Sequence, residues 1–386
     1  MYAAVLCVLL LAHASLAAQP RLVVVISFDQ FRGDMPQTFD RFFGPSGFRR
    51  ITREGTTFPS CYFEHANTIT GPGHAALLTG CYPARTGIVG NDFCDIETGL
   101  CVYCADDDSG VKSASQLRVP TLGDLLRERN SRSKVVGVAL KDRAAILMAG
   151  PMATSCVWYD PKGRAWTSSA AFPAVPWLSA LNASVTATRY AGATWRTRIP
   201  AQAEPAFDSV SAEGVFPGGS QVFPHRIPPA SAPTFMNAVL LSPFSLDMVF
   251  DAATMALRKE RLGRDTVPDL LCVGVSTTDF VGHTFGPDSR EVQELFVHAD
   301  RRLGRFIDEL DRTVGRKHYV LVITSDHGVA PIPEVIRDLP QQQHTRIDAG
   351  RIREAQIKRR IDSVLTARYG PSRTGSYVRT IEEPSV

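Results

Sequence analysis

The sequence predicts an α/β fold of three layers, α/β/α, around a central, mostly parallel sheet. Two observations support this fold class. Four apolar runs rich in valine and isoleucine recur along the 386 residues, and helical patterns lie between them. Strands that alternate with helices favour a parallel sheet. The runs are nearly continuous rather than alternating, which is typical of strands that are covered on both faces.

The expected strands cover residues 22–28, 134–140, 270–276 and 319–325. The clearest helix is expected within 291–310, where apolar residues recur at every third or fourth position. These residues are Val292, Leu295, Phe296, Ala299, Leu303, Phe306, Ile307 and Leu310. A helix with one apolar face of this kind packs that face on the sheet.

The composition changes between about residues 160 and 240, which are rich in proline, alanine, serine and glycine with scattered aromatic residues. Its aromatic content is too high for a disordered linker. We interpret this stretch as an insertion of loops and short elements that caps the site. It belongs to one catalytic domain, residues 19–386.

The first 18 residues have the pattern of a signal peptide. An apolar stretch from Ala3 to Ala12 precedes small residues, and Ser15 and Ala17 stand at the −3 and −1 positions of a cleavage site. We expect cleavage near Ala17/Ala18 and a periplasmic or secreted protein. The stretch is too short to span a bilayer, and no second long apolar run follows, so no membrane span is expected.

The overall composition is that of an ordinary globular protein. Hydrophobic residues make up 44% of the chain and charged residues 21%, so extensive disorder is not expected. A formal charge of +3, from 42 basic and 39 acidic residues, argues against nucleic-acid binding as the main activity. Composition says nothing of the oligomeric state.

Three cysteines lie close together in the run FCDIETGLCVYC: Cys94, Cys101 and Cys104. In an exported protein a local disulfide is favoured over a zinc knuckle, which would need a fourth ligand nearby. The spacing does not decide which of the three are paired. Seven cysteines remain once Cys7 leaves with the signal peptide, so at least one is unpaired in a monomer.

Polar side chains follow each of the four expected strands. Because the carboxyl ends of parallel strands meet at one edge of a sheet, these side chains should converge there. A single Asp after a strand is a common turn former, but four such sites together favour a functional site. The residues are Asp29 after the first strand, Lys141 and Arg143 after the second, Asp279 and His283 after the third, and Asp326 and His327 after the fourth.

Five of these residues are suited to binding metal ions. Asp279 and His283 are four positions apart, so one turn of helix brings both to the same face. Asp326, His327 and Asp29 add two carboxylates and an imidazole, which are zinc ligands. Each residue alone could be a helix cap or a structural histidine. Five ligands exceed the needs of one four-coordinate zinc, so we expect two Zn²⁺ ions.

Residues 67–80, NTITGPGHAALLTG, read as the start of a helix that faces a phosphate. Proline is favoured in a first helical turn, and glycines let the backbone approach a ligand closely. We expect the helix over His74–Thr79, ending at Gly80. Free backbone N–H groups at such a helix start attract phosphoryl oxygens. Either Thr68 or Thr70 could then supply a nucleophilic hydroxyl.

Five stretches resemble the alkaline phosphatase superfamily, and within it the phosphate-irrepressible alkaline phosphatases and the nucleotide pyrophosphatase/phosphodiesterases. They run in family order from residue 22 to about 331: ISFDQFRGD, TGPGHAALLTGCYPARTGIVGND, LKDRAAIL, STTDFVGHTFGP and ITSDHGV. The resemblance implies a zinc-dependent hydrolase of small-molecule phosphate esters. It also implies that Thr70, which directly precedes the G-P-G turn, is the nucleophile and becomes a covalent phosphothreonine.

The same resemblance implies the roles of individual residues. One zinc would be held by Asp29, Asp326, His327 and the oxygen of Thr70, and the other by Asp279, His283 and one further histidine. Lys141, Arg143 and Asn91 would contact the non-bridging oxygens of a phosphate monoester. A phosphate monoester is a dianion and is bound more favourably by two cations, whereas a phosphate diester carries only one negative charge. Diesterase relatives generally lack the Lys/Arg pair. Lys141 and Arg143 could instead pair with Asp142 or with surface acids. A phosphodiesterase is the nearest rival activity.

The run CYPAR at 81–85 matches the C-x-P-x-R signature by which sulfatases convert cysteine into formylglycine. In sulfatases this signature precedes a helix like AALLTG, whereas Cys81 follows that helix here. Thr70 occupies the position that would carry formylglycine. We therefore interpret CYPAR as a chance match, because short motifs often match by accident.

The sequence departs from the family near its C-terminal end. The last zinc-binding histidine of the family lies well downstream of the Asp-His pair, and His344 is the only histidine after His327. The context of His344 does not match. We therefore expect a truncated chain with an incomplete second zinc site, and an inactive protein that binds phosphate esters is an alternative. A basic amphipathic helix is expected around 351–368 and a short strand in YVRTI.

Overall fold

The computed structural model describes residues 19–94, 98–199, 212–338, 350–351 and 353–378. Its centre is a six-stranded sheet with the strand order β10-β1-β9-β4-β5-β6. The strands are β1 (Leu22–Phe28), β4 (Val135–Ala139), β5 (Ser155–Asp160), β6 (Ala165–Thr167), β9 (Asp269–Val275) and β10 (Tyr319–Thr324).

The sheet confirms the predicted fold class. Neighbouring strands run parallel from β10 to β5, and only β6 pairs antiparallel, with β5. The four strands expected from the apolar runs are β1, β4, β9 and β10, each within one residue at either end. The sequence did not reveal β5 and β6, because SCVWYD is short with polar ends and β6 has only three residues.

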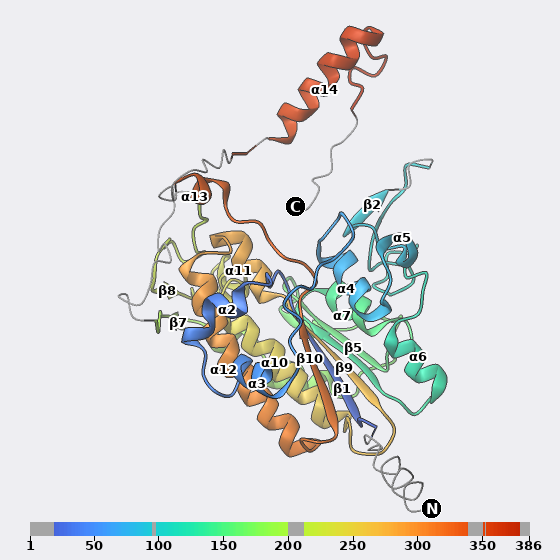
Figure 1. Cartoon of the computed structure of the whole chain (residues 1–386), viewed down its shortest axis with the longest axis vertical. Helices are drawn as coiled ribbons and strands as arrows, with labels where there is room; N and C mark the ends of the chain where they lie inside the picture. Colours follow the sequence, from blue (N-terminus) through green and yellow to red (C-terminus); the bar gives the residue numbers. More distant parts are fainter. Residues whose placement is uncertain (1–18, 95–97, 200–211, 339–349, 352, 379–386) are drawn as a thin grey trace, which may run out of the picture.

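Helices cover both faces of the sheet (Figure 1). One layer contains α10 (Pro243–Lys259) and α12 (Arg290–Thr313), and the other contains α4 (Thr70–Thr79), α6 (Leu122–Arg129) and α7 (Asp142–Ala149). The apolar side chains form one core on each side of the sheet. All eight apolar residues predicted for the helix within 291–310 are buried, so α12 packs as expected.

Strand β1 shows how the two cores arise from one apolar run. Val24 and Ile26 lie in the core below α10 and α12, whereas Val25 lies in the core on the α4 and α7 side. Alternate side chains of a strand point to opposite faces, so a strand inside a three-layer fold needs apolar residues at every position. This is the physical reason for the unbroken run LVVVISF.

The expectation that all four strands are covered on both faces is wrong for β10. This strand lies at the edge of the sheet, and Val320 and Val322 are 46% and 40% exposed. The two residues share one face of the strand, and the described part of the chain leaves that face open. Continuous apolar sequence therefore indicates a strand, but it does not by itself indicate that both faces are buried.

The predicted insertion is a set of short elements, part of which packs against the end of α11 and the start of α12. Glu294 of α12 accepts hydrogen bonds from the backbone N–H groups of Arg198 (2.6 Å) and Ile199 (2.7 Å). Glu291 lies 2.8 Å from Nε2 of the buried His225. Two carboxylates of α12 thus anchor the insertion, and its role as a cap over the site stays a prediction. The helices and short strands of the insertion are α8 (Leu178–Ser184), η2 (Ala187–Tyr190), β7 (Thr194–Trp195), β8 (His225–Arg226) and α9 (Phe235–Leu240). Helix α11 (Thr277–Phe285) follows β9 and is not part of the insertion.

The remaining elements lie before β4 and after β10. The helix expected around 351–368 is present as α14, but Tyr377 and Val378, the described start of YVRTI, are not in a strand. The predicted signal peptide lies outside the described residues. No helix in the described part of the chain is both long and apolar enough to cross a membrane. The elements are α2 (Met35–Phe39), η1 (Asp40–Phe42), α3 (Phe48–Glu54), α5 (Pro83–Thr86), β2 (Asp92–Cys94), β3 (Cys101–Tyr103), α13 (Pro333–Asp338) and α14 (Glu354–Tyr369).

A disulfide joins Cys94 to Cys101 across the antiparallel pair β2 and β3. This confirms the prediction of a local disulfide and decides the pairing that the sequence left open. Cys104 is free and buried. It lies under the start of α4, because a Cβ placed on Gly71 would be 3.1 Å from its sulfur. The disulfide therefore joins the two strands at the loop end of the hairpin, and the open end of the hairpin packs against α4.

Gly73 provides a test of how closely α4 packs on the loop after β10. A Cβ at this position would lie 2.1 Å from the carbonyl oxygen of Asp326. We expect Gly73→Ala to lower the free energy of unfolding by about 2 kcal/mol, because neither backbone can move away freely. Urea denaturation measures this change in the free energy of unfolding. Gly33→Ala is the matched control, since its Cβ would meet nothing within 4 Å. Equal stability of the two variants would contradict the close approach.

Candidate active site

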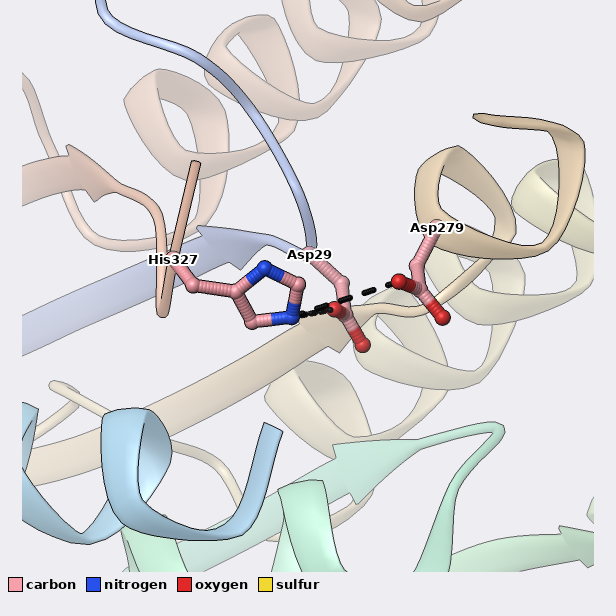
Figure 2. A group of neighbouring side chains, drawn as sticks. All are labelled: Asp29, Asp279 and His327. Carbon is pink, nitrogen blue, oxygen red and sulfur yellow. Dashed lines mark ion pairs between the residues drawn. The ribbon is translucent and has the colours of Figure 1, made fainter. Parts of the chain in front are cut away.

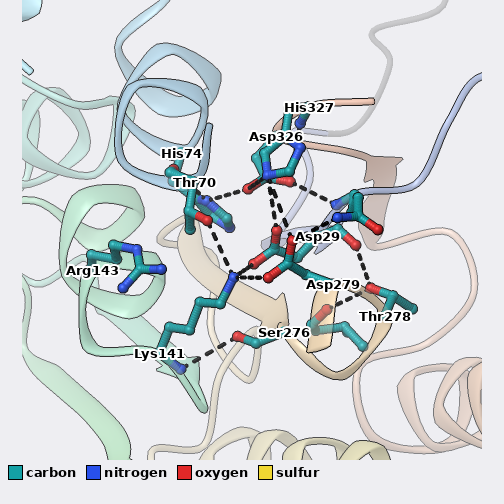
Figure 3. A network of polar contacts seen from close by, with 12 residues as sticks. Asp29, Thr70, His74, Lys141, Arg143, Ser276, Thr278, Asp279, Asp326 and His327 are labelled. Atoms are coloured by element: carbon teal, nitrogen blue, oxygen red, sulfur yellow. Dashed lines mark hydrogen bonds and ion pairs between the residues drawn. The ribbon is translucent and has the colours of Figure 1, made fainter. Parts of the chain in front are cut away.

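The polar residues that follow the strands meet at one edge of the sheet, as predicted (Figure 3). Asp29 directly follows β1, and Lys141 precedes the first residue of α7. Asp279 lies in the first turn of α11, which begins shortly after β9. Asp326 and His327 lie in the loop after β10. Strands β10, β1, β9 and β4 are neighbours in that order, so their carboxyl ends bring these residues together.

Asp29, Asp279 and His327 form a group that could hold a metal ion (Figure 2). One ligand atom from each lies within 4.8 Å of the others. Nε2 of His327 is 3.3 Å from Oδ1 of Asp29, 3.6 Å from Oδ2 of Asp326 and 4.0 Å from Oδ1 of Asp279. All four side chains are buried. Carboxylates around an imidazole are a donor set that suits zinc.

Two carboxylate oxygens at this site support the presence of a cation. Oδ1 of Asp29 and Oδ2 of Asp326 are buried, and neither accepts a hydrogen bond of good geometry from the described residues, although Nε2 of His327 lies 3.3 Å from the first and Nδ1 of His74 3.0 Å from the second. Buried anionic oxygens without donors cost several kcal/mol, roughly, and nearly all such groups in proteins have a partner. The residues therefore fit a metal ion on an observation of their own, apart from any resemblance.

Lys141 lies deeper in this group than the sequence suggested. Its ammonium donates hydrogen bonds to Oδ2 of Asp29 and Oδ2 of Asp279, both at 2.6 Å, and to Oγ1 of Thr70 at 3.2 Å. Burial disfavours the ammonium, but the carboxylates of Asp29 and Asp279 outweigh it and raise the pKa of Lys141. The alternative that Lys141 pairs with Asp142 or a surface acid is thus not what the structure shows.

Asp279 and His283 share one face of α11, as the spacing predicted. Nε2 of His283 lies 3.1 Å from Oδ1 of Asp279, and the hydrogen bond with Asp279 raises the pKa of the imidazole despite partial burial. The His283 side chain is 70% exposed. Of the three-residue group above, His283 touches only Asp279. His344, the only later histidine, lies outside the described residues.

Thr70 is the first residue of α4, so the helix begins four residues earlier than predicted. Gly71-Pro72-Gly73 is its first turn rather than a loop before it, because proline has no N–H to lose there and its φ already suits a helix. Thr70 is 3% exposed and touches Lys141. Thr68 precedes the helix in irregular backbone, and no described contact joins it to the metal-binding group.

Asn91 and Arg143 flank the start of α4. The backbone N–H of Gly71 donates a 2.8 Å hydrogen bond to Oδ1 of Asn91, which leaves the amide NH₂ for another acceptor. Arg143 lies in the first turn of α7, and its Nη1 donates to the hydroxyl of Tyr103 at 3.2 Å. Its Nε is buried without a hydrogen-bond partner among the described residues. Both side chains thus keep donors unused beside Thr70.

Two residues at the site were not foreseen as part of it. His74 is fully buried, and its Nδ1 lies 2.8 Å from the carbonyl oxygen of Thr70 and 3.0 Å from Oδ2 of Asp326. Gln30 donates from its backbone to Asp326 (3.2 Å) and from Nε2 to Asp279 (3.1 Å). The available signals were positional: His74 is one helical turn after Thr70, and Gln30 directly follows Asp29.

Comparison with known proteins places the chain in a family. The model of the type I phosphodiesterase / nucleotide pyrophosphatase family matches residues 23–369, and the chain therefore belongs to that family, within the alkaline phosphatase superfamily. This confirms the resemblance read from the five motifs. The matched range contains the whole central sheet except Leu22, the first residue of β1.

Several relatives are alkaline phosphatases. The chain is 34% identical to the alkaline phosphatase PhoV of Synechococcus elongatus, over 83% of this chain and 61% of that protein. It is 33% identical to the alkaline phosphatase PafA of Elizabethkingia meningoseptica, over 81% and 60%. The crystal structure of wild type PafA aligns with a TM-score of 0.79 at 29% identity, over 92% of this chain and 70% of that one. The chain thus spans about three fifths of the length of these two curated relatives.

The protonation of His327 should make any metal binding at this site dependent on pH. Burial lowers the pKa of His327, but the carboxylates of Asp326 and Asp29 outweigh it and raise that pKa to about 9. A metal ion binds the neutral imidazole. We therefore expect zinc binding to the metal-free protein near pH 7.5 to release about one proton from His327, and its affinity to rise with pH up to about pH 9.

Calorimetric titration with zinc in buffers of different ionisation enthalpy measures this release. His327→Gln should release about one proton fewer than the unchanged protein, because that imidazole is gone. His298→Gln, which alters a histidine paired with Asp247 on α10, is the control and should leave the proton count unchanged. The same proton count in His327→Gln and the unchanged protein would show that His327 is not a ligand.

Proposed function

We propose that this protein is a zinc-dependent alkaline phosphatase that hydrolyses small-molecule phosphate monoesters through a covalent phosphothreonine on Thr70. The observation that carries the proposal is the position of the Thr70 hydroxyl. It lies at the start of α4, 3.2 Å from Lys141, between the buried carboxylate–imidazole group and the unused donors of Asn91 and Arg143. The alkaline phosphatases among its relatives support the same activity.

The proposed zinc ligands come from the ends of three strands. Asp29, Asp326 and His327 would hold one ion beside Thr70, and Asp279 and His283 would contribute to a second. When bound, such ions supply Lewis acidity, which lowers the pKa of a hydroxyl and stabilises a leaving oxygen. The two carboxylate oxygens on Asp29 and Asp326 that accept no hydrogen bond of good geometry from the described residues are the support for this within the structure.

In the proposed reaction the Thr70 oxygen attacks phosphorus, and its proton passes to solvent. The bond between phosphorus and the alcohol oxygen breaks, and the alcohol leaves with a proton from solvent. Water then attacks the phosphothreonine, which releases inorganic phosphate and restores the hydroxyl. The N-terminus of α4 would favour the negative phosphoryl group throughout, because the helix dipole places a partial positive charge at that end.

Selectivity for monoesters is proposed to rest on Asn91, Lys141 and Arg143. Thr70 Oγ1 is within 3.2 Å of the Lys141 ammonium, so a phosphoryl group attached to Thr70 lies next to that charge. Arg143 and the amide of Asn91 supply further donors from the other side of the α4 start. A second ester substituent would remove one negative charge and would bring bulk against these groups.

The location, the domain organisation and the partners of the protein are proposed from other observations. The Cys94–Cys101 disulfide supports an oxidising compartment, which agrees with the signal peptide expected in residues 1–18 and with a periplasmic or secreted enzyme. We also propose that the described chain from residue 19 onward is one catalytic domain, with the insertion at about 160–240 as its cap. The partners are small phosphate esters, with no nucleic acid.

Replacing the proposed nucleophile should abolish turnover. We expect Thr70→Ala to lower kcat for p-nitrophenyl phosphate by at least about 1,000-fold, because among the described hydroxyls only that of Thr70 is hydrogen-bonded to the Lys141 ammonium. Mass spectrometry after rapid acid quenching should find phosphate on the unchanged chain and none on this variant. Thr68→Ala is the matched control and should retain activity. Loss of turnover in Thr68→Ala with activity kept in Thr70→Ala would assign the nucleophile to Thr68.

The preference for monoesters can be measured with two substrates of the same leaving group. The unchanged enzyme should hydrolyse p-nitrophenyl phosphate with a higher kcat/KM than bis(p-nitrophenyl) phosphate. Arg143→Ala should reduce kcat/KM for the monoester by about 10- to 100-fold, and that for the diester by less than about threefold, because only the dianion uses the full charge of Arg143. A strong preference of the unchanged enzyme for the diester would instead assign it as a phosphodiesterase.

A further inference from the structure

A second polar cluster lies behind Arg143, away from the proposed metal ligands. Tyr103 is the last residue of β3, and its hydroxyl donates a 2.5 Å hydrogen bond to Oδ1 of Asp142. The same hydroxyl oxygen accepts a 3.2 Å hydrogen bond from Nη1 of Arg143. The ammonium of Lys112 lies 4.2 Å from the centre of the Tyr103 ring and 3.5 Å from Oδ2 of Asp142.

The chemistry of the groups decides the direction of each hydrogen bond in this cluster. A carboxylate can only accept and a guanidinium can only donate, so the phenol proton must point to Asp142 and a phenol lone pair to Arg143. Burial raises the pKa of Tyr103, so the phenol keeps its proton. Phenylalanine would fill the same space, but it could neither accept from Arg143 nor donate to Asp142.

The same part of the chain also supports Asn91. The backbone N–H of Cys104, the residue after Tyr103, donates a 2.8 Å hydrogen bond to the carbonyl oxygen of Asn91. Asn91 in turn accepts from Gly71 at the start of α4. The hairpin of β2 and β3 is closed by the Cys94–Cys101 disulfide. The disulfide-closed hairpin of β2 and β3 thus contacts both Asn91 and Arg143, which the proposed function places on the phosphoryl oxygens.

Tyr103 also limits where the guanidinium of Arg143 can lie. Arginine has a long side chain with several rotatable bonds, and a free side chain of this kind loses substantial entropy when a ligand orders it. Tyr103 takes one donor of Arg143, whereas the buried Nε has no partner among the described residues. Figure 3 draws Arg143 beside Lys141 and Thr70, on the side where the phosphoryl group is expected.

We propose that Tyr103 is a positioning residue for phosphate recognition: it holds Arg143 in place so that the guanidinium meets a dianionic phosphoryl group without reordering. This inference rests on the proposed function, because it assigns Arg143 to the phosphoryl oxygens. Tyr103 itself is not expected to touch the substrate. Its effect should therefore pass entirely through Arg143 and should be specific to dianions.

Tyr103→Phe tests the proposal. We expect kcat/KM for p-nitrophenyl phosphate to fall by about tenfold, and the inhibition constant of inorganic phosphate to rise by a similar factor, because one hydrogen bond that orients a charged group is lost. The kcat/KM for bis(p-nitrophenyl) phosphate should change by less than about twofold. Tyr159→Phe is the matched control, since Tyr159 is a buried tyrosine whose hydroxyl faces the sulfur of Met236.

Combining the change with Arg143→Ala separates positioning from a general structural effect. In that background Tyr103→Phe should change monoester turnover and phosphate inhibition by less than about twofold, because there is no guanidinium left to orient. A loss of the same size with and without Arg143, or an equal loss on monoester and diester, would overturn the proposal. So would unchanged turnover and phosphate inhibition in the Tyr103→Phe single variant.

The two proposals can fail separately. If the unchanged protein does not hydrolyse monoesters, the proposed function fails. Calorimetric measurement of inorganic phosphate binding then still tests whether Tyr103 positions Arg143. In that case Tyr103→Phe should weaken phosphate binding about tenfold when Arg143 is present and by less than about twofold when it is absent. If the protein hydrolyses monoesters but Tyr103→Phe behaves like Tyr159→Phe, only the inference about Tyr103 fails.

Discussion

Three carboxylates buried at one edge of a parallel sheet need positive charge close by, and much of this site follows from that need. Asp29, Asp279 and Asp326 are each less than 5% exposed. Removing a carboxylate from water costs several kcal/mol, roughly, unless cations or donors compensate. Lys141 bonds two of the three, and His327 lies near all of them. Two carboxylate oxygens, Oδ1 of Asp29 and Oδ2 of Asp326, accept no hydrogen bond of good geometry from the described residues, which is the strongest structural support for a bound cation.

The charge at this edge acts on Thr70 because α4 packs closely against it. Gly73 lets the first turn of α4 approach the carbonyl oxygen of Asp326, where any side chain would collide. His74 spans the same junction, with its ring nitrogen near both the Thr70 carbonyl and Asp326. The hydroxyl of Thr70 thus lies between the buried charges and the N-terminal end of α4, whose partial positive charge would favour the phosphoryl group of the proposed reaction.

On the other side of α4, neutral groups rather than charges provide the support. Asn91 is fixed by backbone N–H groups from Gly71 and Cys104, and Arg143 is fixed by the hydroxyl of Tyr103. The contacts of Gly71 with Asn91 and of Tyr103 with Arg143 each occupy one atom of the supported side chain and leave other donors free. A binding site that is already ordered loses less entropy when its ligand arrives. The disulfide-closed hairpin is therefore part of the proposed recognition of phosphate, although it lies outside the sheet.

The sequence by itself determined the fold class and the residues at the sheet edge, because both depend on local patterns. Unbroken apolar runs mark inner strands, and Asp29 or Asp326 is found simply by reading past the end of a run. The pairing of Lys141 with Asp29, 112 residues away, had no such local signal. Neither did the contacts of His74 or Tyr103, nor the open face of β10. These contacts and this exposure depend on the strand order β10-β1-β9-β4 and on the packing of the β2–β3 hairpin against α4, so only the tertiary structure decided them.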